Sequence, residues 1–175
     1  PPDLGEFARD LRFSDALGCN VTVPHKETVM RYLDRLDDWA AAAGAVNTIV
    51  GRSGNLIGYN TDGLGFLRAL DEQGGLSAKS LRVLVLGAGG VARAVCLALA
   101  QGGVEAITIA NRTVAKADAL VNLFKPVAGE TALSACGFEQ PREPFDVIIN
   151  GTSASLQGDL PPLSPEVLGE QTVVY

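Results

Sequence analysis

Three short segments in the first third of the chain contain side chains that could perform acid–base chemistry or hydrogen-bond a ligand. These segments are Asn20–Glu27, Gly44–Thr48 and Gly58–Gly63. We consider Lys26 and Asp62 as candidate acid–base residues. Each of them could also have a purely structural role. Lys26 could be a surface lysine that opens a helix, and Asp62 could cap the helix that follows it. Spacing alone leaves both interpretations open.

The same segments contain Thr22, His25 and Asn47. Thr22 and Asn47 could hydrogen-bond a ligand, or they could be strand residues that face water. His25 is the single histidine of the chain, and a structural role is the more common one for such a residue. One histidine and three widely spaced cysteines argue against a zinc site, so we expect no metal. Isolated thiols are typical of a cytoplasmic protein.

The second half of the chain contains a glycine-rich loop with the pattern G-x-G-x-x-A. The apolar run Leu81–Leu86 precedes it and a helical apolar pattern follows, which is the context that a dinucleotide-binding loop requires. Its glycines permit a tight turn and a close approach of a pyrophosphate, and the N–H groups at the helix start attract the phosphates. A plain turn is the alternative. The residues that we expect to bind the cofactor here are Gly87, Ala88, Gly89, Gly90 and Val91.

The residues after the next expected strand, Ala106–Ala110, indicate which dinucleotide is bound. An NAD enzyme usually has Asp or Glu at this point, to bind the ribose 2′-hydroxyl. This chain instead has Asn111, Arg112 and Thr113, with Lys116 one turn later. A guanidinium can hold a phosphate through two hydrogen bonds and a lysine adds a second positive charge, so the pattern favours the 2′-phosphate of NADP. Solvated surface charges are the alternative.

A third strand of this region is expected at Phe145–Ile149, and it leads towards Thr152 and Ser153. Residues at the carboxyl ends of parallel strands are where doubly wound sheets bind ligands, so both are candidate cofactor contacts, with an ordinary polar turn as the alternative. Strands and helices alternate from Ser80 to a last strand at Thr172–Tyr175. This alternation predicts a parallel sheet with right-handed crossovers.

Shorter elements are expected before this region. They are a strand at Cys19–Pro24, helices at Lys26–Leu36 and Trp39–Ala43, a hairpin of Val46–Val50 with Leu56–Tyr59, and a helix at Gly63–Leu70. The predicted fold class is therefore α/β, with a Rossmann-like doubly wound parallel sheet and a second, smaller α/β domain. We place the smaller domain at residues 1–64 and the dinucleotide-binding domain at residues 65–175.

The bulk composition narrows the class of ligand. Of the 175 residues, 47% are hydrophobic and 19% are charged, which is enough apolar material for a packed core. The formal net charge of −6 argues against a nucleic-acid-binding surface, which needs clustered lysine and arginine. No uninterrupted apolar run reaches the roughly 18 residues of a transmembrane helix, so we expect no membrane partner. A small molecule is the expected partner.

The motifs NVTVPHKE, GAVNT, YNTDG, GAGGVAR, NRTVAK and NGTSAS occur in this order along the chain. In order and spacing they closely resemble the shikimate dehydrogenase family, which includes quinate-acting relatives. The resemblance extends over essentially the whole chain. It implies the NADPH-dependent reversible reduction of 3-dehydroshikimate to shikimate, a step of aromatic amino-acid biosynthesis.

The resemblance also implies roles for individual residues. Lys26 and Asp62 match the catalytic pair of the family, and Thr22 and Asn47 match residues that hydrogen-bond the substrate hydroxyls. Tyr175 matches a tyrosine that the nucleotide domain places near the substrate. Lysine suits the chemistry, because hydride delivery to a ketone builds negative charge on oxygen that a cation or proton donor must neutralise.

Two segments of the family pattern are not found in this sequence: the N-terminal motif with two serines that bind the substrate carboxylate, and the final segment that completes the first domain. We therefore expect a chain truncated at both ends, with both domains incomplete. Two alternatives stay open, a quinate/shikimate dehydrogenase that uses NAD or NADP and a catalytically impaired NADP-binding fragment. The oligomeric state, monomer or homodimer, is also open.

The charge pattern after residue 110 generates a prediction about cofactor choice. Arg112→Ala should raise the KM for NADPH roughly tenfold or more, because a charge-assisted hydrogen bond contributes roughly 1.5–3 kcal/mol. The KM for NADH should change little, since NADH has no 2′-phosphate. Steady-state kinetics with both cofactors measure the difference, and equal changes for the two would contradict the assignment.

Overall fold

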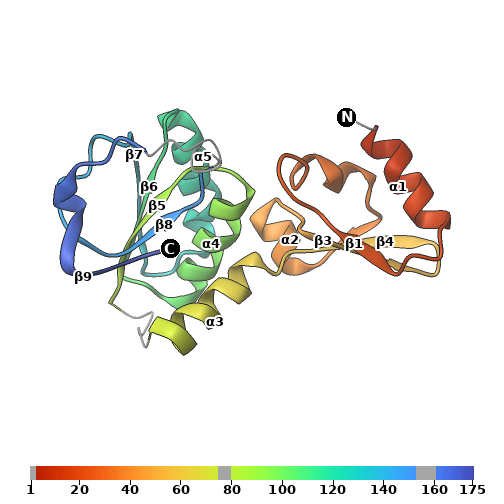
Figure 1. Cartoon of the computed structure of the whole chain (residues 1–175), viewed down its shortest axis with the longest axis horizontal. Coiled ribbons are helices and arrows are strands. Elements are labelled where there is room, and N and C mark those ends of the chain that lie inside the picture. Colours follow the sequence, from red (N-terminus) through yellow and green to blue (C-terminus); the bar gives the residue numbers. More distant parts are fainter. Residues whose placement is uncertain (1–2, 75–79, 153–160) are drawn as a thin grey trace. The chain divides into compact units, whose positions relative to one another are not determined.

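The computed structural model describes residues 3–74, 80–152 and 161–175. The chain forms two compact units, Pro1–Asp62 and Gly63–Tyr175. Figure 1 labels most of the helices and strands of both units along the chain. None of the described helices is both long and apolar enough to cross a membrane. The three cysteines are free thiols, and burial raises the pKa of the Cys96 thiol to about 12.

The first unit consists of short helices and a four-stranded sheet. Its elements are α1 (Leu4–Phe13), β1 (Gly18–Asn20), the 3₁₀ helix η1 (Thr28–Tyr32), β2 (Arg35–Leu36), α2 (Asp38–Ala43), β3 (Thr48–Arg52) and β4 (Asn55–Tyr59). The strand order is β1-β3-β4-β2, with β1, β3 and β4 antiparallel and β2 parallel to β4. The predicted hairpin and the helix ending before Gly44 are confirmed.

The core of the first unit forms where α1 and the loops cover the sheet. The Asp3 carboxylate caps α1 by accepting from the Gly5 N–H at 2.7 Å. The helix then turns Ala8 and Leu11 into the core. The buried members of this cluster are Ala8, Leu11, Val29, Ala40, Val46, Ile49 and Leu56. These side chains are buried together, so the hydrophobic effect holds the short elements in place.

The predicted helix at Lys26–Leu36 is wrong. Lys26 lies in a turn, η1 covers only Thr28–Tyr32, and the chain then extends into β2. The reason is a tertiary contact: the Asp34 N–H donates to the Leu56 carbonyl at 2.9 Å, and the Leu56 N–H donates to the Asp34 carboxylate at 2.7 Å. These bonds draw the chain into the sheet beside β4. The predicted strand at Cys19–Pro24 is also shorter, ending at Asn20 ahead of a cis Val23–Pro24 bond.

The second unit is built on a parallel sheet. Its elements are α3 (Asp62–Gly74, whose first residue closes the first unit), β5 (Arg82–Leu86), α4 (Gly90–Gly102), β6 (Ala106–Ala110), α5 (Val114–Phe124), η2 (Lys125–Val127), β7 (Ala132–Cys136), β8 (Phe145–Asn150), η4 (Pro165–Val167) and β9 (Leu168–Val174). The order is β7-β6-β5-β8-β9, and all four pairings are parallel. The predicted α/β class with a Rossmann-like parallel sheet is confirmed.

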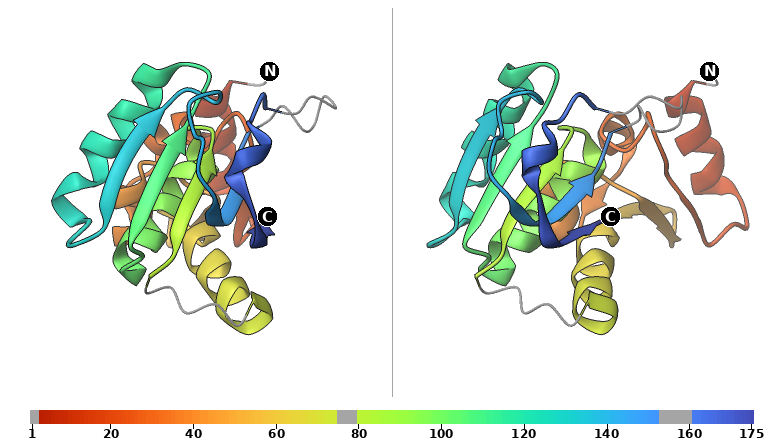
Figure 2. Two further views of the ribbon diagram at one scale, coloured as in Figure 1. Left: turned by 90° about the vertical axis from the view of Figure 1, so that its left-hand side faces the viewer. Right: turned by 60° about the vertical axis from the view of Figure 1, so that its left-hand side comes forward.

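The two faces of this sheet are covered differently. In Figure 2, α4 and α5 lie against one face. Leu84 and Leu86 of β5 belong to a buried cluster on the other face, together with Phe145, the first residue of β8, and Val167, the last residue of η4 before β9. Val83–Leu86 of β5 are all apolar and buried, as expected for a central parallel strand that is covered on both faces.

A clamp between distant residues closes the first unit. Arg12, in the last turn of α1, donates to the Asp34 carboxylate at 2.6 Å and to the Gly54 carbonyl at 2.7 Å. The same carboxylate accepts the Leu56 N–H. The Arg12 hydrogen bond, and after it the Leu56 hydrogen bond, hold the pKa of Asp34 below its ordinary value of 3.8. The Asp34 carboxylate therefore ties α1 to β4, and Arg12 ties both to the β3–β4 turn.

This clamp predicts a pH-dependent contribution to stability. Asp34→Asn should lower the free energy of unfolding at pH 7 by roughly 1 kcal/mol. A carboxyl group with a depressed folded-state pKa stabilises above its unfolded pKa and loses that effect as pH falls through the folded value. The difference from the unmodified chain should thus shrink below about pH 3.8. Urea unfolding at several pH values measures it, with the exposed Asp10→Asn as control, and a pH-independent difference would contradict the clamp.

Candidate active site

Lys26 and Asp62 form an ion pair in the first unit, although they are 36 residues apart. The Lys26 Nζ lies 2.6 Å from the Asp62 Oδ2. The lysine side chain is 12% exposed and the aspartate side chain 25% exposed, so the pair is partly shielded but open to a ligand. Lys26 lies in the turn before η1, and Asp62 is the first residue of α3. The ammonium can therefore supply a positive charge or a proton beside an orienting carboxylate.

The Asn47 side chain holds the other oxygen of this carboxylate. Its Nδ2 donates to the Asp62 Oδ1 at 2.7 Å and to the Thr61 Oγ1 at 2.9 Å. Its Oδ1 accepts from the Thr48 hydroxyl at 2.9 Å and from the Thr61 N–H at 3.2 Å. Both oxygens of Asp62 thus receive a donor, one from Asn47 and one from Lys26. The structure brings three of the predicted site residues into one network.

Thr22 lies at the border of this network. Its carbonyl accepts from the His25 N–H at 2.9 Å, in the turn that leads to Lys26. The preceding residue, Val21, donates its N–H to the Asn47 carbonyl at 2.7 Å, so the segment with Thr22 runs beside Asn47. Thr22 itself is exposed. Its side chain is therefore open to solvent or to a ligand.

Asn60 is a site residue that the sequence did not single out. It is 3% exposed, and its side chain joins the Ala45 carbonyl to the Asp62 N–H. An asparagine that bonds the backbone two residues ahead is a common turn device. That local signal was present in the sequence, but the Ala45 partner is 15 residues away and could not be read from it.

In the second unit, the glycine-rich loop connects β5 to α4, as predicted. Gly87 has a φ of +98°, which L side chains rarely adopt, and a Cβ added there would lie 3.0 Å from the Gly151 carbonyl oxygen. Gly89 precedes the first turn of α4, and a Cβ there would meet nothing within 4 Å. Ala88, Gly90 and Val91 complete this loop and the helix start. The N–H groups of the first turn of α4 suit an anion.

Three loops leave the same edge of the parallel sheet. Leu86 is in register with Ala110 on one side and with Asn150 on the other, so β5, β6 and β8 end together. The Gly87 N–H donates to the Ala110 carbonyl at 2.8 Å, and the Gly151 N–H donates to the Leu86 carbonyl at 2.9 Å. These bonds place the glycine loop between the two neighbouring loops. The strand order reverses here, which is where doubly wound sheets bind ligands.

The loops beside the glycine turn contain most of the other predicted cofactor residues. The Thr152 hydroxyl and N–H both donate to the Asn150 Oδ1, at 2.7 and 3.1 Å. Ser153 lies outside the described residues. The Asn111 Nδ2 donates to the Thr113 carbonyl at 2.9 Å, which shapes the loop after β6.

Arg112 and Lys116 lie on the loop after β6 and in the first turn of α5. Both are exposed. Neither forms an ion pair with any other residue in the described ranges. Their charges are consequently available to an anion at this end of the sheet.

Tyr175 follows β9 in the second unit. Its N–H donates to the Ile148 carbonyl at 2.9 Å, and its carbonyl accepts from the Asn150 N–H at 2.8 Å. Its ring meets Phe66 of α3 edge-on, with the ring centroids 5.4 Å apart and an interplanar angle of 77°. Tyr175 is 38% exposed, so the ring keeps a surface for other contacts.

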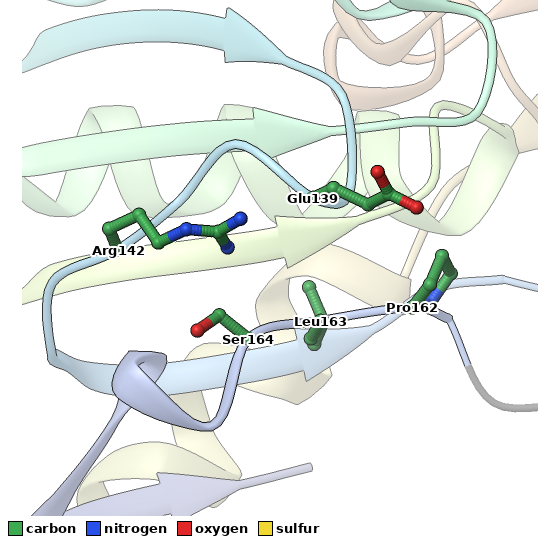
Figure 3. Close-up of a pocket in the computed structure, with 5 residues that line it drawn as sticks. All are labelled: Glu139, Arg142, Pro162, Leu163 and Ser164. Atoms are coloured by element: carbon green, nitrogen blue, oxygen red, sulfur yellow. The ribbon is translucent and has the colours of Figure 1, made fainter.

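A cavity of about 280 Å³ lies elsewhere in the second unit. Figure 3 shows it between the connections that precede β8 and β9, over the sheet. Its lining residues are Glu139, Arg142, Pro162, Leu163 and Ser164. None of them belongs to the predicted site, so the cavity is separate from the loops described above.

The parallel sheet with a glycine turn at its switch point belongs to the Rossmann-like α/β class. Residues 1–49 match the shikimate dehydrogenase substrate binding domain, and residues 69–157 match shikimate / quinate 5-dehydrogenase. The chain belongs to the shikimate/quinate dehydrogenase family.

Three similar proteins show how much of this chain, and how much of each relative, is matched. The shikimate dehydrogenase (NADP(+)) of Alkalilimnicola ehrlichii is 48% identical over 162 residues, which cover 93% of this chain and 59% of that protein. The structure of Thermus thermophilus shikimate 5-dehydrogenase with NADP(H) and shikimate is 34% identical, with a TM-score of 0.81 over 98% of this chain and 61% of that one. The ligand-free 5-ketofructose reductase of a Gluconobacter strain is 37% identical, with a TM-score of 0.79 over 98% and 62%. The chain spans about 60% of the length of such relatives.

The two glycines of the loop should respond differently to substitution. Gly87→Ala should lower the free energy of unfolding by about 1–3 kcal/mol, because alanine is strained at φ +98° and crowds the Gly151 carbonyl. Gly89→Ala should change it by less than about 0.5 kcal/mol, because its Cβ enters open space. Urea unfolding followed by circular dichroism compares the variants, and equal losses would contradict this division.

Proposed function

We propose that the chain carries the catalytic pair and the NADP site of a shikimate dehydrogenase, which reduces 3-dehydroshikimate reversibly to shikimate with NADPH. The observation that carries the proposal is the Lys26–Asp62 ion pair, 2.6 Å long and held on its second oxygen by Asn47. The named relatives with this activity support the same substrate. The assignments of domains and residues below are part of this proposal.

Lys26 is proposed to act on the substrate carbonyl. Bound NADPH would supply a hydride, whose electron pair forms the new C–H bond while the π electrons of the carbonyl move to oxygen as an alkoxide and NADP⁺ remains. The Lys26 ammonium neutralises the developing charge and donates the proton that completes the hydroxyl. Asp62 orients the ammonium, because its Oδ2 lies 2.6 Å from Nζ. In shikimate oxidation the same groups work in reverse.

Thr22, Asn47 and Tyr175 are proposed to orient the substrate. Thr22 is exposed and Tyr175 is partly exposed, so their hydroxyls can donate to or accept from substrate hydroxyls or carboxylate. Asn47 is engaged with Thr61 and Asp62, so in this arrangement a substrate hydroxyl would reach it by sharing or replacing one of those bonds. Replacing hydrogen bonds already made limits the net gain.

The residues of the second unit fit NADP. The open approach at Gly89 and the N-terminus of α4 suit the pyrophosphate, with Gly87 shaping the turn and Thr152 beside it. Arg112 and Lys116 suit the 2′-phosphate, because both cations are exposed where an NAD enzyme would have a carboxylate. This charge pattern does not favour the alternative with NAD as cofactor.

The proposal predicts a large, selective loss on removing the ammonium. Lys26→Ala should lower kcat for shikimate oxidation about 10²–10⁴-fold, the usual contribution of a positioned acid–base group. Binding of NADPH should be retained, because Lys26 lies outside the loops proposed for the cofactor. NADPH formation from shikimate and NADP measures kcat, and fluorescence titration measures cofactor binding.

The matched control is Lys125→Ala, which removes an exposed lysine after α5 and should leave both quantities unchanged. An unchanged kcat in Lys26→Ala would remove this lysine from the mechanism. If the unmodified chain binds NADPH but oxidises neither shikimate nor quinate, it is a cofactor-binding chain without turnover. Activity with quinate and NAD would instead favour the broader quinate/shikimate specificity.

A further inference from the structure

The backbones of Lys26 and Asp62 are joined through one buried peptide group, the one between Ala45 and Val46. The Val46 N–H donates to the Lys26 carbonyl at 2.8 Å. The carbonyl of the same peptide, from Ala45, accepts from the Asn60 Nδ2 at 2.9 Å. The Asn60 Oδ1 in turn accepts the Asp62 N–H at 3.0 Å. Ala45 and Val46 are both 0% exposed.

We propose that Asn60 is a positioning residue that sets the geometry of the Lys26–Asp62 pair through this peptide. A peptide unit is planar and rigid, so its N–H and C=O ends are fixed relative to each other. One end holds the backbone of the lysine and the other holds the backbone of the aspartate through a single side chain. Asn60 is the one link of this connection that is a side chain and can be exchanged without altering the backbone.

Burial gives this link its strength. Asn60 is 3% exposed, and of the described residues only it and Thr131 are buried polar or charged residues. A buried amide is costly unless it is hydrogen-bonded, and both ends of Asn60 are bonded. Loss of the side chain would leave the Ala45 carbonyl and the Asp62 N–H unpaired at once. The start of α3 and the turn of Lys26 could then shift against each other.

This inference rests on the proposed function. Its test therefore uses two measurements, one of catalysis and one that does not require catalytic activity. Asn60→Ala should lower kcat for shikimate oxidation about 10²-fold, the effect of a displacement of roughly 1 Å, while the KM for NADPH stays within about twofold. Acetic anhydride labelling measured by mass spectrometry gives the second readout. Lys26 labelling relative to Lys125 should rise about threefold, because the ammonium is less firmly paired.

The matched control is Thr131→Val. It removes the other buried side-chain hydrogen bond to a carbonyl, from the Thr131 hydroxyl to Val104 at 2.7 Å, within the second unit. A general loss of stability should therefore affect both variants, whereas the loss of kcat and the rise in Lys26 labelling should occur only in Asn60→Ala. Thermal unfolding confirms that each variant is folded.

If Asn60→Ala does not fold, Asn60→Ser is tested in its place. Its hydroxyl can still accept the Asp62 N–H but is too short to span the distance to the Ala45 carbonyl, so an intermediate effect on both readouts is expected. Wild-type kcat and labelling in the folded Asn60 variant would overturn the inference, as would an equal loss in Thr131→Val. If the unmodified chain has no activity, the proposed function fails, and the labelling ratio alone decides the role of Asn60.

Discussion

The carboxylate of Asp62 is the centre on which the first unit's site depends. Each of its oxygens receives a donor from a different segment, the ammonium of Lys26 and the amide of Asn47. These segments meet because the hairpin of β3 and β4 places Asn47 and Tyr59 side by side, with the Asn47 N–H donating to the Tyr59 carbonyl. The sheet, the Asn60 link and the turn of Lys26 all serve to hold donors around one partly shielded charge.

In the second unit, sheet register brings the loops together, and side-chain bonds only shape them locally. β5, β6 and β8 end at the same level, so the loops that follow them converge at one edge of the sheet. A glycine with positive φ then lets the chain turn sharply beside its neighbour. A fixed backbone edge with free N–H groups and exposed cations is well suited to a ligand with several phosphates.

Much of this could be predicted from the sequence, for reasons that are local. The apolar run Val83–Leu86 of β5, the glycine pattern after it and the helical stripe of α4 each arise within a few residues. The parallel arrangement followed from alternation of strands and helices. The pairing of Lys26 with Asp62 came from the resemblance to a family and not from spacing, and the structure places the two side chains in contact.

The features that sequence reasoning missed depend on partners far along the chain. The apolar residues between Lys26 and Leu36 fit a helix, but Asp34 bonds to Leu56, 22 residues away, and the chain extends instead. Strand β7, at Ala132–Cys136, is half-exposed at the sheet edge and has no strong apolar pattern. Asn60 was an unremarked polar residue between two motif positions until its buried partner was known.

The contact between Gly87 and Gly151 limits how this protein can be redesigned. The loop after β5 and the loop after β8 contact each other through backbone atoms. An added side chain or an inserted residue in either loop would therefore displace the other loop. The loop after β6 is held from within by Asn111 and presents its charged side chains outward. A library intended to change cofactor preference would therefore best vary residues 112–116 and leave both glycines unchanged.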